Sequence, residues 1–391
     1  MHIKRGIPIL DDIDKLGFVG FLSNVGFASI ATIWAIYLES FFHNESYVGF
    51  TITALTIISL FSCIFIIPLI EKNNKVKVFA ISLMLYALSY FLFGVLSNFY
   101  AVILLSAIMA FVVSLRVISY GIIVADKSKK RSLARNEGFI YTFMNISWLI
   151  GPLIAGFVSR QFGLRAVFIL AAIFVLISFL LLLNFKIYDG RITKKYDKDL
   201  WKICKEFFKN KNLRLCYILS GGINFWWALI YIYIPLHIVY SGYRSEIVGY
   251  FLFSAMIPLI LFTYPFGKLA GKVGFKKIFF IGYFILGISA IICFFINNLM
   301  FILGILVLAS MGAAMVESPT EAYFFDISGR KKDRYYGVYN TTIDINHAIA
   351  SFIGAIILFL ADFKFVFLFF GGIMILISFL SLKIKNIIED C

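Results

Sequence analysis

The sequence predicts an all-α membrane protein with twelve transmembrane helices, arranged as two pseudo-symmetric six-helix bundles. Hydrophobic residues make up 61% of the chain and charged residues only 15%, with a mean hydropathy of +0.93. Long stretches therefore have no polar side chains to meet water. Twelve apolar runs are each long enough to cross a bilayer. The last six runs repeat features of the first six about 200 positions later in the chain.

The apolar runs define the expected helices, because a helix needs about 20 mainly apolar residues to cross the hydrocarbon core. Runs of this length must be helical there, since backbone groups find no water inside a bilayer. The expected spans of the first half are 16–42, 46–70, 78–97, 100–124, 137–159 and 166–186. Those of the second half are 214–239, 246–268, 278–297, 299–324, 336–360 and 365–384.

A polar stretch separates the two sets of spans. We therefore expect an N-terminal six-helix bundle at 1–186, a cytoplasmic linker at 187–213 and a C-terminal six-helix bundle at 214–391. Apolar residues recur at helical spacing among lysines within the linker, which predicts an amphipathic helix lying on the membrane face. These residues are Leu200, Trp201, Cys204, Phe207 and Phe208.

The formal net charge of +15 is concentrated in one set of loops. Lys and Arg hold loops on the cytoplasmic side of a membrane. We therefore expect a multi-pass protein of the cell membrane with both termini cytoplasmic, and we ascribe the basic charge to topology and to anionic lipid rather than to nucleic acid. The Lys and Arg residues outside the cytoplasmic segments are Arg160, Arg165, Arg244 and Lys364 in the opposite loops and Arg116 within a span.

Several classes of protein lack support in the sequence. The five cysteines are scattered, with no CxxC pair and no neighbouring histidines, so we expect neither a disulfide framework nor a metal site. The four histidines form no catalytic pattern, and no phosphate-binding loop of an ATPase is present. We therefore expect no enzyme, no cofactor and no ATP-driven pump. The predicted partners are a small molecule, protons and the lipid bilayer, with the chain acting as a monomer.

Three patterns stand out in the sequence. Two of them are charged loops that occur in both halves, and the third is a set of small residues in the fifth span. The loop after the second span contains Glu71, Lys72, Lys75 and Lys77, and the loop after the eighth contains Gly267, Lys272, Gly274, Lys276 and Lys277. Asp126 and Asp326 each precede a further basic loop. The fifth span carries Gly138, Ser147, Gly151, Pro152, Ala155 and Gly156.

These patterns resemble those of the major facilitator superfamily, and the helix count extends the resemblance over the whole chain. Ile67 and Asn74 replace the two glycines of the first loop signature, and Gly271 replaces the acid of the second. The fifth span resembles the motif of drug/proton antiporters, with Ser147 and Ala155 in two glycine places. The resemblance implies that both loops latch the cytoplasmic side in the outward-open state. The simpler alternatives are an interfacial charge cluster and a kinked, closely packed helix.

Few charged residues lie deep within the spans, where an insertion cost of about 2.5 to 3.5 kcal/mol favours a partner or a wet cavity. Arg116 and Glu317 occupy nearly equivalent positions of the two repeats, about 12 Å from the cytoplasmic end. The resemblance implies that they face each other across a central cavity. Arg116 also resembles the arginine of the antiporters' fourth-helix motif, although Gly121 falls one place late.

Our hypothesis is that Glu317, with Glu321 one turn away, exchanges a proton while Arg116 holds the unprotonated form charged. A structural ion pair that joins the two halves is the alternative. Glu39, Asp344 and His347 are further candidates, and Asp344 and His347 lie one turn apart and could satisfy each other.

Aromatic and amide side chains could shape the cavity, because flat rings bind amphiphilic or cationic ligands. The alternative is ordinary helix packing. The resemblance places the first and seventh spans around the cavity, and the candidate residues on them are Asn24, Trp34, Tyr37, Asn224, Trp226, Trp227 and Tyr231.

The expected function is secondary transport of a small molecule by alternating access, with proton-coupled efflux of drug-like or amphiphilic compounds as the first hypothesis. A proton-coupled symporter or uniporter of a sugar, organic acid or other metabolite is the alternative, since Arg116 would suit an anionic substrate. A receptor or scaffold that no longer transports remains a third possibility.

Overall fold

The computed structural model describes residues 11–128, 133–187, 200–385 and 387 of the chain. Twelve segments within this part are helical, long and apolar enough to cross a membrane, which confirms the predicted fold class. The first half contains α1 (Asp12–Phe42), α2 (Glu45–Lys72), α3 (Lys75–Val95), α4 (Phe99–Lys127), α5 (Leu133–Phe162) and α6 (Leu164–Asn184). The second half contains α8 (Lys211–Ala228), η1 (Leu229–Tyr233), α9 (Ile234–Tyr240), α10 (Glu246–Val273), α11 (Phe275–Phe294), α12 (Leu299–Ser328), η2 (Gly329–Lys331), α13 (Lys332–Leu360) and α14 (Lys364–Ser381).

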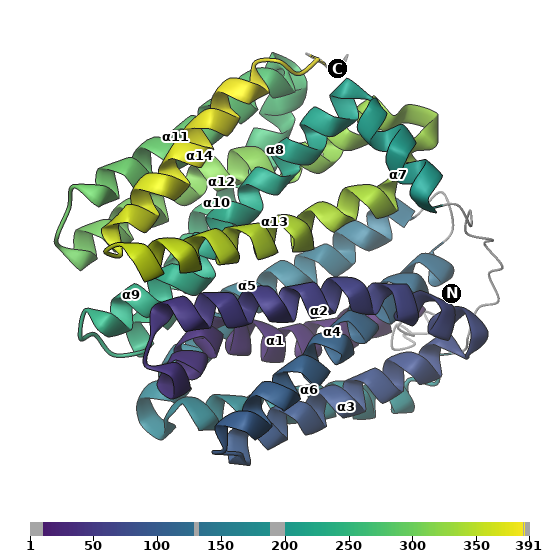
Figure 1. The fold of residues 1–391 in the computed structure, drawn as a ribbon. Coiled ribbons are helices and arrows are strands. Elements are labelled where there is room, and N and C mark those ends of the chain that lie inside the picture. The colour runs from purple at the N-terminus through teal and green to yellow at the C-terminus, as the bar shows by residue number, and fades with distance from the viewer. Residues whose placement is uncertain (1–10, 129–132, 188–199, 386, 388–391) are drawn as a thin grey trace, which may run out of the picture.

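The two halves use equivalent helix pairs, as their internal repeat predicts. In the first half α1 packs against α5, α3 against α6 and α2 against α4. In the second half α8 packs against α13, α11 against α14 and α10 against α12. Figure 1 shows the first half in the lower part of the view and the second half in the upper part. The described part of the linker contains a short helix, α7 (Leu200–Lys209), beside the second half.

The repeat extends to the residues that begin the helices. Asn98 caps α4 by accepting a hydrogen bond from the amide of Ala101 at 3.1 Å. Asn298, 200 positions later, caps α12 by accepting one from the amide of Met300 at 2.9 Å. Such caps satisfy backbone donors that a helix leaves unpaired at its start.

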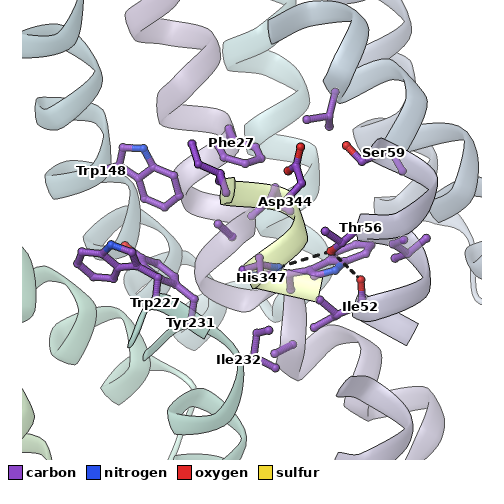
Figure 2. A pocket seen from close by; sticks show the side chains of 18 of the residues that line it. Phe27, Ile52, Thr56, Ser59, Trp148, Trp227, Tyr231, Ile232, Asp344 and His347 are labelled. Atoms are coloured by element: carbon purple, nitrogen blue, oxygen red, sulfur yellow. Dashed lines mark hydrogen bonds between the residues drawn. The ribbon is translucent and has the colours of Figure 1, made fainter. Parts of the chain in front are cut away.

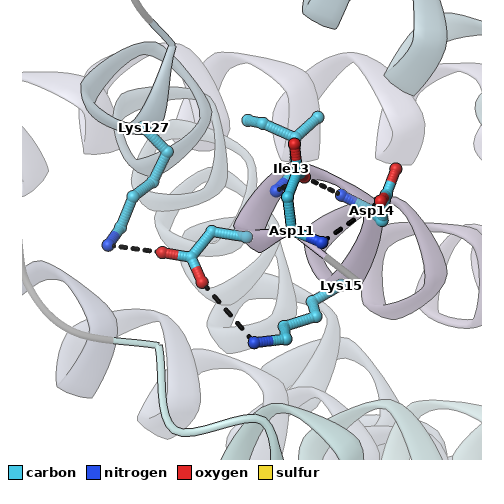
Figure 3. Close-up of polar contacts among 6 residues, drawn as sticks. Asp11, Ile13, Asp14, Lys15 and Lys127 are labelled. Carbon is cyan, nitrogen blue, oxygen red and sulfur yellow. Dashed lines mark hydrogen bonds and ion pairs between the residues drawn. The ribbon is translucent and has the colours of Figure 1, made fainter. Parts of the chain in front are cut away.

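Ion pairs join the helices of the first half at the end of the bundle where α1 begins and α14 ends, here named the termini end. Asp12 of α1 pairs with Lys127 of α4 at 2.8 Å and with Lys15 at 3.7 Å, next to the Asp11 cap of α1 (Figure 3). Lys75 at the start of α3 pairs with Asp126 near the end of α4. These contacts hold α1, α3 and α4 in one unit.

The halves meet along two seams, both at the far end, which is opposite to the termini end. The first seam joins α2 to α13. A Cβ atom added to Gly49 would lie 2.7 Å from Cβ of Ala355, so the helices approach closely only because residue 49 is glycine. Thr53 and Ser351 share a hydrogen bond of 2.9 Å across this seam. The Tyr233 hydroxyl, from the seventh span, donates to the Ser351 carbonyl at 2.5 Å.

The second seam joins α5 to α10 in the equivalent way. A Cβ atom added to Gly249 would lie 2.7 Å from Cα of Gly156. Arg160 pairs with Glu246 at 2.9 Å near the far ends of these two helices. Because both seams lie at the far end, the halves are held together there.

Candidate functional site

A cavity of about 640 Å³ lies between the two halves. Its lining comes from both halves, namely from α1 to α5 and from α8, η1, α10, α12 and α13. The lining residues Tyr141 of α5 and Ile343 of α13 lie toward the termini end and are 54% and 53% exposed. The two seams close the opposite side. The cavity therefore opens toward the termini end of the bundle.

Three aromatic rings form one wall of the cavity. Trp148 of α5 and Trp227 of α8 flank Tyr231 of η1, with ring centroids 5.3 Å and 5.9 Å from that of Tyr231 (Figure 2). Tyr231 lies on a π-helical turn that directly precedes Ile234 and Pro235. Because proline has no N–H to donate, Pro235 interrupts the regular hydrogen-bond pattern of the helix next to this turn. Such π-helical turns are frequent at functional sites.

Glu317 of α12 lines the cavity, and no ion pair with Glu317 is formed within the described part of the chain. Its Oε2 atom is buried and has no hydrogen-bond partner within the described part of the chain. Glu321, one turn closer to the termini end, accepts a hydrogen bond from the Tyr336 hydroxyl at 3.0 Å and lies outside the lining. The two predicted acids therefore differ in environment, and Glu317 alone faces the cavity.

A second polar group lies on α13, where Asp344 and His347 both line the cavity. The Thr56 hydroxyl of α2 donates to the Ile52 carbonyl at 2.8 Å, so it accepts any hydrogen bond from His347 Nδ1, 3.5 Å away (Figure 2). His347 thus reaches across from the second half to the first. Among the described residues, no hydrogen bond joins Asp344 to His347, so the expected mutual contact is not formed.

Arg116 does not face Glu317, which corrects the expected pairing across the cavity. Arg116 is only 4% exposed and lies outside the cavity lining. Its guanidinium donates to Ser23 at 3.2 Å and to Asn24 at 3.3 Å, and it lies 5.0 Å from the centroid of the Tyr86 ring. Arg116 therefore stabilises packing inside the first half in this conformation.

Three of the aromatic and amide candidates line the cavity, namely Trp34, Trp227 and Tyr231. The others lie outside the lining, because they point into helix contacts. Tyr37 donates to the Phe93 carbonyl, Trp226 is buried in the core of the second half, and Asn224 donates to the Ser220 carbonyl of its own helix. Asn24 bonds to Arg116, and Glu39 lies near Glu45 and Tyr240 at the far end.

The predicted loop residues lie at the termini end. Gly274 joins α10 to α11 with φ +92°, a conformation that favours glycine. The equivalent Asn74 has φ −66° and caps α3 through the amide of Lys77, which explains why glycine is not needed there. Lys72, Lys77, Lys272, Lys277 and Asp326 are exposed, Lys276 and Gly267 are half-buried, and Lys75 pairs with Asp126. The surroundings of Glu71 and Gly138 lie outside what the structure describes.

The small residues of the fifth span allow close contacts on two sides of α5. A Cβ atom added to Gly151 would lie 2.5 Å from Cβ of Ala28 in α1. The Pro152 carbonyl and Gly156 abut Gly249 of α10. The motif thus lies where α5 packs against its own half and against the other half.

Sequence reasoning missed several lining residues on α5 and α2. Tyr141 and Trp148 line the cavity together with Met144 and Asn145, and their spacing places all four on one face of α5. Thr56 and Ser59 contribute from α2. The helical spacing of the four α5 residues in the sequence could have indicated that they share one face. Among the described residues, the lining contains two carboxylates and no lysine or arginine.

A family profile and several known proteins that resemble this chain point to the same superfamily. The sequence profile of the Major Facilitator Superfamily matches residues 16–259 and 225–386. Multidrug resistance protein 2 of Bacillus subtilis is 21% identical over 377 residues, which cover 92% of this chain and 93% of that protein. The quinolone resistance protein NorA of Staphylococcus aureus is 24% identical over 354 residues, which cover 86% of each chain.

A third relative and two solved structures extend the comparison. An uncharacterised MFS-type transporter of Methanocaldococcus jannaschii is 26% identical over 249 residues, which cover 62% of this chain and 63% of that protein. The nucleoside transporter NupG superposes with a TM-score of 0.75 at 14% identity, over 95% of this chain and 99% of NupG. A peptide transporter POT in complex with sulfate gives 0.78 at 11% identity, over 97% and 95% of the two chains. These structures share the fold.

Proposed function

Because this chain belongs to the Major Facilitator Superfamily, we propose that it exports drug-like, amphiphilic cations in exchange for protons. One observation carries the proposal. The cavity between the halves is lined by aromatic rings and by the carboxylates of Glu317 and Asp344, and its described lining contains no lysine or arginine. Aromatic faces and unpaired carboxylates both favour organic cations. The two resistance proteins similar to this chain support the direction of transport.

The exchange chemistry rests on Glu317. An ionised carboxylate in an apolar cavity loses hydration and is stabilised by a proton or by a cation. A proton and a cationic substrate therefore compete for the same carboxylate, so that binding of one favours release of the other. Asp344 provides a second carboxylate in the same cavity. In this proposal, protons that enter from outside displace the substrate.

Alternating access requires the seams and the loops to act in turn. Loop charge predicts that the termini end is cytoplasmic, so in this proposal the cavity collects substrate from the cytoplasm. The far-end seams must then separate, while the loops after α2 and α10 close the termini end.

The expected alternative is a symporter or uniporter of a sugar, organic acid or other metabolite, and its anionic substrates were expected to bind Arg116 in the cavity. Arg116 lies outside the lining, so this alternative loses its main support. A chain that binds a ligand without transporting it makes a different prediction, because it would show affinity for the cation but no flux.

The test uses purified protein in proteoliposomes with an acidic interior and the lipophilic cation tetraphenylphosphonium outside. The proposal predicts that the cation accumulates above the level in empty liposomes. Nigericin with equal potassium on both sides collapses the pH gradient without setting a membrane potential, and it should abolish the accumulation. Accumulation that is equal with and without the pH gradient would contradict proton exchange. Gradient-driven uptake of sugars or organic acids, with no movement of the cation, would favour the metabolite transporter.

A further inference from the structure

The linker helix α7 is fixed to the second half of the protein. Ile203 and Phe207 are buried on one face of α7, and the Phe207 ring lies 5.8 Å from that of Tyr335 in α13. Both carboxylate oxygens of Glu206 contact the guanidinium of Arg334, at 3.1 Å and 3.4 Å. These contacts hold α7 on α8 and α13, so α7 moves with the second half.

A different part of the α7 surface is exposed and carries both aromatic and basic side chains. Trp201 is 82% exposed, and Phe208 is also exposed. Lys205 and Lys209 are exposed beside them. Residues 201, 205 and 208 are spaced by one helical turn and therefore share a face. A large exposed indole on a packed helix favours an apolar or interfacial surrounding over water.

The position of α7 identifies what can cover this surface. α7 ends at Lys209, Asn210 caps the next helix, and α8 begins at Lys211 as a membrane-spanning segment. Only one residue therefore separates α7 from a span. The start of the eleventh span at Arg334 lies directly beside it. This places α7 where helices enter the bilayer, and tryptophan and lysine are the side chains typical of that depth.

A basic pocket lies between α7 and α13. Its volume is about 420 Å³, and it is lined by Glu206, Lys209, Asn210, Lys331, Arg334 and Tyr335. Glu206 is engaged by Arg334, so the lining carries an excess of positive charge from the two lysines. Lysine ammonium groups bind phosphate as point charges. The pocket therefore suits a phosphate group at the membrane surface.

We propose that α7 is a binding site for anionic phospholipid. The lipid phosphate binds between Lys209 and Lys331, while Trp201 and Phe208 insert into the interface beside it. The charge of the site is complementary to an anionic leaflet, and its apolar edge continues the surface of the adjacent spans. The bilayer then holds the second half directly through α7. This inference is independent of the transported substrate.

The first test uses the full chain in nanodiscs of phosphatidylcholine with or without phosphatidylglycerol, and measures apparent unfolding temperature. Phosphatidylglycerol should raise that temperature for the wild type and for the control Lys383→Gln/Lys385→Gln, which loses the same charge from the end of the chain. The variant Lys209→Gln/Lys331→Gln should require about tenfold more phosphatidylglycerol for the same rise. An equal response of this variant and the wild type would overturn the proposal.

Two further measurements complete the test. The first distinguishes a lipid phosphate from a soluble one, and the second asks whether Trp201 of α7 lies in the bilayer. Inorganic phosphate added to phosphatidylcholine nanodiscs should cause no rise, and a rise equal to that from phosphatidylglycerol would show a soluble anion instead of a lipid. Brominated phosphatidylcholine should quench a fluorescence component that Trp201→Phe removes. If the quenching is the same in the wild type and in Trp201→Phe, Trp201 lies outside the bilayer and the proposal fails.

Discussion

The carboxylate of Glu317 lines the cavity and has a buried oxygen with no partner among the described residues, so a ligand or a proton in the cavity can bind it. Glu317→Gln removes the charge but keeps the size. We expect affinity for a lipophilic cation to fall about 10- to 100-fold, because a hydrogen bond to a charged group contributes about 1.5 to 3 kcal/mol. Exchange for protons should be lost. Equilibrium binding and proteoliposome flux measure the two effects.

Glu321→Gln is the matched variant, since Glu321 is bonded to Tyr336 and lies outside the lining. It should retain binding and exchange within about threefold of the wild type, a difference of less than 1 kcal/mol. Loss of exchange in Glu321→Gln with retention in Glu317→Gln would transfer the proton role to Glu321.

Arg116 should affect stability rather than substrate binding. Arg116→Lys keeps the charge but loses the planar group that bonds to Ser23 and Asn24 and stacks near Tyr86. We expect unfolding to become easier by about 1 to 3 kcal/mol, with cation affinity unchanged. A thermal melt with and without ligand measures both effects. Weaker cation binding at unchanged stability would contradict this prediction and would show that Arg116 contributes to the cavity.

The error over Arg116 has a simple geometric cause. Arg116 and Glu317 are separated by 201 positions, whereas the repeat offset at Asp126 and Asp326 is 200. One residue turns a side chain by about 100° around a helix. That rotation directs Arg116 into its own half, while Glu317 faces the cavity. The sequence identified both rare charges but could not fix their directions.

At the level of elements, the glycines of α10 should differ sharply in tolerance. A Cβ atom at Gly249 would lie 2.7 Å from Cα of Gly156, whereas one at Gly267 would meet only the Ser318 hydroxyl at 3.7 Å. We therefore expect Gly249→Val to separate α5 from α10 at the far end and to expose Ser159, which bonds to Ser245 across the same seam at 3.1 Å and is only 7% exposed. Labelling of Ser159→Cys from the far side measures this separation.

Gly267→Ala is the control on the same helix, and it should leave the labelling of position 159 unchanged. Equal labelling in Gly249→Val and in the control would show that the α5–α10 seam tolerates a side chain. The seam glycines were readable in part from the sequence. Gly49 and Gly249 lie 200 positions apart, but only the packed structure shows that each one touches the opposite half.

At the scale of the whole molecule, the twelve helices, their division into two similar halves and the site between the halves follow from apolar run length and from the repeat. The open side of the cavity does not, because alternating access would use the same helices to line an opening on either side. Side chains near the termini end, such as Tyr141 and Ile343, are exposed in the cavity, whereas the seams bury the far end. The structure therefore corresponds, in the proposed mechanism, to the state that is open at the termini end.

Locking the far end tests this account of the whole molecule. A Cβ atom at Gly49 would lie 2.7 Å from Cβ of Ala355, and a disulfide needs about 3.8 Å, so a parting of about 1 Å permits the bond. We expect Gly49→Cys/Ala355→Cys, made after replacing the native cysteines, to form a disulfide when oxidised. Cation binding should persist, because the cavity stays open at the termini end, while proton exchange should stop until a reductant is added. Exchange at an unchanged rate in the oxidised protein would mean that the halves transport without separating at the α2–α13 seam, and the alternating-access proposal would fail with it.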